Sequence, residues 1–234
     1  MNIRKILTYV TLISTALFLS SAQAGELIYS GFMSDYTQLE KVTDGSADYR
    51  YLAPGGEERM AQFDAVMIDQ PEIFIANESP YRGAKPKHTL ALAELLRSGL
   101  TSALSEDLYV VDSPGENVLY VSMAITNVNL TKKKRGILGY TPVGFAVGSV
   151  KGAATSNLAK KADLQSIVFE LEAFDSVSGE RIVALIDSFG SGVQENASWE
   201  ELGEFMAKYG RIMQCRFSNA RLVVEQRANC LALD

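Results

Sequence analysis

Residues 118–130 read VLYVSMAITNVNL and alternate in a way that is typical of one long strand. Alternate positions are apolar, and these are Leu119, Val121, Met123 and Ile125. Successive strand side chains point to opposite faces of a sheet, so the pattern predicts a half-buried strand. Residues 166–173 alternate in the same way, with Ile167, Phe169, Leu171 and Ala173 on one face and Glu170 and Glu172 on the other. We expect these two strands to pair.

The segment between these strands, residues 131–162, reads TKKKRGILGYTPVGFAVGSVKGAATSNLAKKA. It holds seven basic residues and no acidic one, around an apolar, glycine-rich centre. Three of its glycines recur every fourth residue, a spacing that on a helix allows close approach of another backbone. We predict that this basic connection contacts a protein partner or an anionic membrane surface. The predicted contact residues are Lys132, Lys133, Lys134, Arg135, Gly144, Gly148, Lys151 and Gly152. The alternative is an ordinary connection whose glycines serve turns and whose lysines maintain solubility.

The remaining elements follow from periodicity and turn signals. Residues 63–69 read as a buried strand that Pro71 interrupts, and residues 108–112 read as a short strand. Residues 89–104 carry leucines at helical spacing, and residues 181–189, apolar on both faces, predict an internal strand after a hairpin turn. Ser198 opens a second long helix, in which Arg216, Arg221 and Arg227 would suit the dipole of its last turns. The predicted fold is α+β: an antiparallel or mixed sheet of about five strands with two main helices on one face.

The N-terminal residues 1–24 have the features of a cleaved secretory signal. A basic start is followed by an apolar run and by the small-residue ending Ala22-Gln23-Ala24. We therefore expect export to the periplasm, with peripheral membrane association through the basic connection. Residues 25–62 have no regular pattern and are expected to pack on a single α+β domain formed by residues 63–234.

The charge and the cysteines limit the class of protein further. All 28 acidic residues lie after residue 24, against 22 basic residues in the whole chain, and this excess argues against nucleic-acid binding. Cys215 and Cys230 are the only cysteines, and an even number in an oxidising compartment favours a disulfide. On one straight helix their Cα atoms would lie about 22 Å apart. A bridge therefore requires the chain to turn back after about Arg227, and two free buried thiols are the alternative.

Motifs for catalysis are missing from the sequence. The single histidine, His88, has no second histidine or cysteine at a metal-ligand spacing, so we predict neither a metal nor another cofactor. No nucleophile elbow or phosphate-binding loop is present. Acidic residues are numerous, so a carboxylate-dependent hydrolase stays as the alternative function. Asp69, Asp112, Asp175 and Asp187 are expected at strand ends, in turn roles.

Several segments together resemble the domain of unknown function 3313 family of bacterial envelope proteins, many of which are lipoproteins. These segments are SGFMSDYTQLE (30–40), RYLAP (50–54), FDAVMIDQPEIF (63–74), LYVVDSPGENVLYVSMAITNV (108–128) and FDSVSGERIVALID (174–187). The resemblance implies an envelope protein without an assigned activity. Gly25 stands where lipidated relatives would carry a cysteine. By fold analogy the strand order also resembles small envelope auxiliary domains of the transport-lipoprotein and TolB N-terminal type, which favours a binding role.

Overall fold

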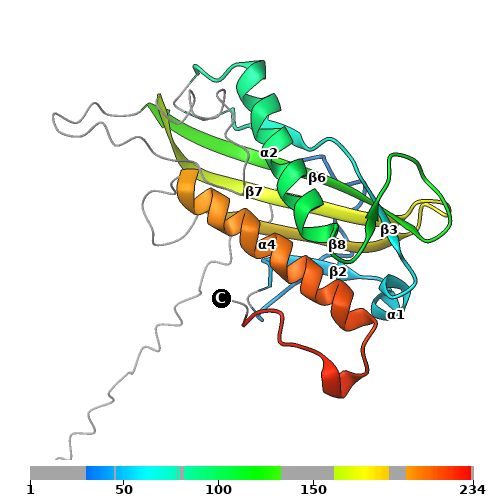
Figure 1. Ribbon diagram of the computed structural model, residues 1–234. Coiled ribbons are helices and arrows are strands. Elements are labelled where there is room, and N and C mark those ends of the chain that lie inside the picture. The colour runs from blue at the N-terminus through cyan, green and yellow to red at the C-terminus, as the bar shows by residue number, and fades with distance from the viewer. Residues whose placement is uncertain are drawn as a thin grey trace, which may run out of the picture.

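The computed structural model describes residues 30–44, 46–77, 79, 82–132, 161–189 and 199–232. The predicted signal segment, residues 1–24, and most of the basic connection lie outside these residues. The described residues form a mixed α+β fold, in which a single sheet carries its long helices on one face (Figure 1). The predicted fold class is therefore confirmed.

The sheet has eight strands in the order β1-β2-β8-β7-β6-β3-β5, with β4 beside β6. The strands are β1 (Glu40–Lys41), β2 (Tyr49–Leu52), β3 (Ala65–Ile68), β4 (Glu72–Ile75), β5 (Tyr109–Val110), β6 (Val118–Lys132), β7 (Ala162–Asp175) and β8 (Arg181–Phe189). The prediction of about five strands was too low. The N-terminal segment, predicted to be irregular, contributes β1, β2 and the short helix α1 (Gly56–Met60), and β4 is separate from β3.

The two longest strands, β6 and β7, form the centre of the sheet. They pair antiparallel, from Leu119 opposite Asp175 to Lys132 opposite Ala162, as the alternation predicts. A bulge interrupts the ladder near Asn127, whose positive φ of 48° lies in the left-handed region that asparagine tolerates. β8 lies between β2 and β7. Both of its faces are apolar because Ile182 and Leu185 lie in the main core, whereas Ala184 and Ile186 lie in a second cluster on the other face.

The strands on the other side of β6 run parallel to it. β3 and β4 both pair with β6, and the chain between them contains Pro71, which has no N–H for a ladder bond. The helix α2 (Pro86–Leu104) connects β4 to β5, and β5 then pairs in parallel with β3 at the sheet edge. The sheet is mixed because of this crossover.

Helices α2 and α4 (Trp199–Ala220) lie across one face of the sheet (Figure 1). The main core lies beneath them and includes Leu96, Leu104, Met123 and Phe169. The two helices approach closely at Gly210, where an added Cβ would lie 2.9 Å from the Cβ of Ala103. A glycine is therefore needed at this crossing.

The opposite face of the sheet is covered by the N-terminal segment. Met33 is buried there with Val168, Ala184 and Ile186, while Tyr36 and other aromatic side chains from this segment pack around them. This second, smaller cluster shows that residues 30–52 belong to the folded body. No described helix is both long enough and apolar enough to cross a membrane.

Candidate functional site

The end of the sheet at which β6 stops and β7 begins is the first candidate site. Lys132, the last residue of β6, is exposed and is the only predicted contact residue that the structure describes. The others lie outside the described residues, and they are Lys133, Lys134, Arg135, Gly144, Gly148, Lys151 and Gly152. The basic connection therefore begins and ends on neighbouring strands, at one end of the molecule.

The root of the connection is firmly packed. The Ser79 hydroxyl donates to the carbonyl oxygen of Leu130 at 3.0 Å, and the Leu130 N–H donates back to the Ser79 oxygen at 2.9 Å. Leu130, Leu164 and Ala162 are fully buried. The Ser79 side chain thus satisfies both backbone groups of Leu130, as a neighbouring strand would. The end of β6 at which the connection begins is therefore well packed.

His88 lies at the same end and closes the first turn of α2. Its Nδ1 accepts a hydrogen bond from the Lys85 backbone N–H at 3.1 Å. Burial lowers the pKa of His88, and the charges of Lys87, Lys161 and Lys85 lower it further. The lowered pKa favours the neutral form of the histidine, whose ring nitrogen caps the helix. The described residues contain no cluster of acidic, histidine or cysteine side chains that could hold a metal ion.

These electrostatic contacts also show that lysines from separate parts of the chain gather here. Lys85 and Lys87 at the start of α2, and Lys161 before β7, are exposed, as is Lys132. In Figure 1, α2 begins at the end of the sheet where β6 stops. We call these four lysines the basic end. None of them forms an ion pair with a described residue. Sequence reasoning missed Lys85 and Lys87 because two lysines beside Pro86 and His88 form no recognisable binding motif.

Two buried glutamates lie on the face covered by the N-terminal segment. Glu170 is 0% exposed, and its two carboxylate oxygens accept hydrogen bonds from Tyr36 at 2.8 Å and Thr126 at 2.7 Å. Glu172 accepts from Arg181 Nη1 at 2.8 Å. The alternation pattern had placed both glutamates on the face away from the core. Both glutamates do lie on that face, but they are buried because residues 30–52 cover it.

Arg181 connects Glu172 to the N-terminal segment. Its guanidinium donates to the Asp35 carbonyl at 2.6 Å and to Gln38 Oε1 at 2.7 Å, and it lies 4.7 Å from the centroid of the Tyr51 ring. Burial raises the pKa of Glu172, and Arg181 opposes that effect. These hydrogen bonds of the two glutamates join β7 to neighbouring parts of the fold. Neither glutamate is among the lining residues of the cavities described below.

Asp187 also differs from its expected turn role. It lies inside β8, and its carboxylate accepts a hydrogen bond from the Tyr209 hydroxyl of α4. Burial raises the pKa of Asp187, and it raises the pKa of Tyr209 as well. This pair attaches α4 to the sheet. Asp175, by contrast, accepts from the Val177 and Ser178 N–H groups and has the turn role that was expected.

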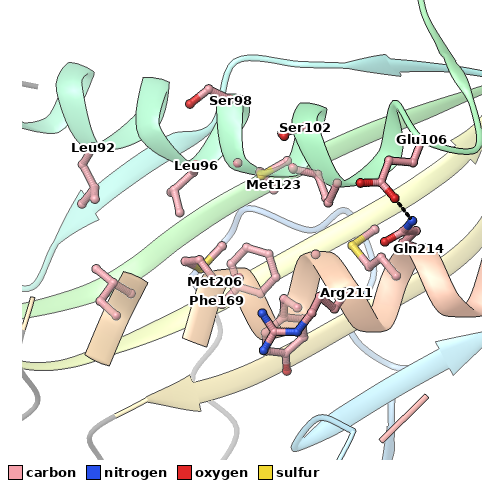
Figure 2. A pocket seen from close by; sticks show the side chains of 18 residues that line it. Leu92, Leu96, Ser98, Ser102, Glu106, Met123, Phe169, Met206, Arg211 and Gln214 are labelled. Carbon is pink, nitrogen blue, oxygen red and sulfur yellow. Dashed lines mark hydrogen bonds between the residues drawn. The ribbon is translucent and has the colours of Figure 1, made fainter. Parts of the chain in front are cut away.

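A largely apolar cavity of about 260 Å³ lies between α2 and α4. In Figure 2, Leu92 and Leu96 point from α2 toward Met206 of α4, with Met123 and Phe169 of the sheet behind them. At one end Gln214 donates a hydrogen bond to Glu106. Most of the lining side chains are apolar, so the cavity is chiefly an apolar recess.

The predicted disulfide between Cys215 and Cys230 is present, with Cα atoms 5.5 Å apart. The helix ends at Ala220, so the chain turns back seven residues before Arg227. Arg221 and Arg227 were expected to complement the dipole of α4 from within its last turns. This prediction is wrong, because both residues lie beyond the end of the helix.

Comparison with known proteins identifies the family. The family model described as a protein of unknown function (DUF3313) matches residues 28–211, so the chain belongs to this family. No curated protein matches the chain. A PelC dodecamer from Paraburkholderia phytofirmans is similar at 12% identity and a TM-score of 0.34, covering 68% of this chain and 90% of that one. A neuraminyllactose-binding hemagglutinin homolog from Helicobacter pylori is similar at 12% identity and a TM-score of 0.31, covering 75% and 90%.

Proposed function

We propose that this member of the DUF3313 family is a non-enzymatic accessory protein of the bacterial cell envelope. It is exported to the periplasm and binds an envelope partner through the basic connection between β6 and β7. The single observation that carries the proposal is the basic end. Four exposed lysines from three parts of the chain lie where a segment with seven basic residues and no acidic one begins and ends.

The electrostatics of the basic end favour an anionic partner. Each lysine near an anionic membrane surface contributes up to about 1 kcal/mol to binding. The chain carries a net charge of −6, but charges farther than about 8 Å are largely screened at physiological salt. A partner therefore responds mainly to the nearest patch. Either an anionic membrane surface or an acidic face of an envelope protein matches this chemistry.

The packing at the root supports a binding role as well. The two hydrogen bonds between Ser79 and Leu130 fix the end of β6, so the connection begins at a fixed position. A fixed attachment lowers the conformational entropy lost when a partner binds. The hydrolase alternative gains no comparable support, because the buried carboxylates are occupied by Tyr36, Thr126 and Arg181.

The experiment compares two variants that lose the same charge. One replaces residues 132–134 by serine, and the other replaces Lys41, Lys208 and Arg211, which are exposed elsewhere. Each protein is incubated with washed envelope membranes and with vesicles containing 30 mol% anionic lipid, at low and high salt. We expect only the first variant to lose sedimentation with membranes. Equal sedimentation of the two variants would contradict the proposal.

The vesicle arm identifies the kind of partner. Binding to pure lipid vesicles that salt abolishes indicates the membrane surface itself. Binding to envelope membranes but not to lipid vesicles indicates a protein. Loss of binding in both variants would show that total charge, and not the basic end, is responsible.

A further inference from the structure

A second cavity, of about 420 Å³, lies at the other end of α4 from the basic end. The residues that line it come from β2, α1, β8, the last turns of α4 and the loop that follows. Three arginines from three of these elements line it: Arg50 of β2, Arg216 of α4 and Arg227 of the loop. Only two acidic side chains, Asp44 and Glu57, are among its described lining residues.

Two of the three arginines already have acidic partners. Arg50 Nη1 lies 3.5 Å from Asp44 Oδ2 and donates to Ser46 Oγ at 3.2 Å. Arg227 Nη1 lies 3.0 Å from Glu57 Oε2. Both acids in the lining are thereby used.

Arg216 is the arginine that is left over. Its guanidinium makes no hydrogen bond and no ion pair with any described residue. The side chain is partly buried, and burial together with the charge of Arg50 lowers the pKa of Arg216. Asp44, Tyr209 and Glu57 act in the opposite direction. An arginine nevertheless stays charged at any physiological pH. A cation removed from water without a partner costs free energy, and an anion placed beside it would offset that cost.

We propose that this cavity binds a small anionic molecule through a carboxylate or phosphate group, with the Arg216 guanidinium contacting the charge. A guanidinium presents paired N–H donors whose geometry matches both groups. The rest of the lining suits a short apolar body, because it includes Leu52, Met60, Val183, Ala220 and Leu231. The volume is within the range of small-molecule sites.

Hydrogen bonds and a disulfide attach the loop that lines the cavity to α4. Asn219 Nδ2 donates to the Ala228 carbonyl at 2.8 Å, and the Ala228 N–H donates to Asn219 Oδ1 at 2.8 Å. The disulfide from Cys215 to Cys230 attaches the same loop to the helical turn that carries Arg216. The binding energy is therefore not consumed in ordering the loop.

The test titrates the full chain with inorganic phosphate, with octanoate and with the neutral octanamide, by calorimetry and by thermal shift. The variants are Arg216→Gln and Arg211→Gln, the latter removing an exposed arginine of the same helix. We expect at least one anion to bind, octanamide not to bind, and Arg216→Gln to weaken binding about tenfold or more, the loss of one charged hydrogen bond. Arg211→Gln should bind as the wild type does.

The stability of the ligand-free variants separates a binding role from a structural one. If Arg216 is an unpaired cation, Arg216→Gln should unfold at the same temperature as the wild type or a higher one. A lower unfolding temperature without ligand, no binding of either anion, or unchanged binding in Arg216→Gln would each overturn the proposal. Binding of octanoate but not phosphate identifies a carboxylate with an apolar body, and the reverse identifies a phosphate site.

Discussion

Removal of Arg181 should destabilise the protein strongly, because this residue neutralises a buried carboxylate. The side chains of Arg181 and Glu172 are only 9% and 6% exposed, and their closest atoms lie 2.8 Å apart. Loss of one partner from a buried ion pair costs about 3–5 kcal/mol, since it leaves the other charge buried. With a urea m-value of about 2–3 kcal/mol/M, Arg181→Met should lower the urea midpoint by about 1–2.5 M.

A matched control is available in the pair of Arg59 and Glu180, whose carboxylate partner is 59% exposed. Exposed pairs contribute about 0–1 kcal/mol, so Arg59→Met should shift the midpoint little. The double variant Arg181→Met with Glu172→Gln should recover most of the stability that Arg181→Met loses. Equal effects of the two arginine variants, or no recovery in the double variant, would refute the role assigned to Glu172.

The pH dependence of the Arg181→Met variant provides a second readout. Burial already raises the pKa of Glu172 above its usual 4.5, and loss of Arg181 removes the charge that opposes this shift. The folded state then binds the proton more tightly than the unfolded state. The deficit of Arg181→Met should therefore be smallest below about pH 4.5 and grow as the pH rises through the raised pKa. A deficit that is constant between pH 4.5 and 7 would contradict this reasoning.

Three further predictions concern other parts of the fold. Reduction of the Cys215–Cys230 disulfide, which spans 15 residues, should cost about 3 kcal/mol, and an unchanged melting temperature in reductant would disprove it. Gly99→Ala should stabilise α2 by about 0.5–1 kcal/mol, because the added Cβ would meet nothing within 4 Å. Gly210→Ala should destabilise the protein, because its added Cβ would lie 2.9 Å from the Cβ of Ala103. Urea unfolding of both variants measures the two effects. Burial holds the pKa of His88 below its usual 6.5, so the unfolded chain takes up the proton first. The free energy of unfolding should therefore fall from pH 7.5 to 5.5, and an equal slope in His88→Gln would exclude the histidine as its source.

The long elements could be predicted from the sequence because their patterns are strong. The alternation over residues 118–130 gave β6, and leucines at helical spacing gave α2. The short strands could not be predicted in this way. β2 exists because Tyr49–Leu52 pairs with Val183–Ile186 of β8, a partner more than a hundred residues away. Such pairing depends on tertiary context and leaves little periodic signal in four residues.

The buried charges were missed for a related reason. Glu170 and Glu172 alternate with apolar residues, and alternation alone assigns charged positions to solvent. Their burial depends on Tyr36 and Arg181, which come from separate elements and could not be matched to them by spacing. Arg216 likewise matched a helix-dipole pattern, and only the fold places it in a cavity with two other arginines.

The most direct measurement of the proposed contact surface is site-specific photo-crosslinking in intact cells. A photoreactive residue at position 132 samples the basic end, and one at Val177, exposed in the turn after β7, samples the opposite end of the same strand pair. The proposal predicts a light-dependent protein or lipid adduct at position 132, reduced when Lys133, Lys134 and Arg135 are replaced by serine, and no such adduct at position 177. Equal adducts at both positions, or none at position 132, would contradict it.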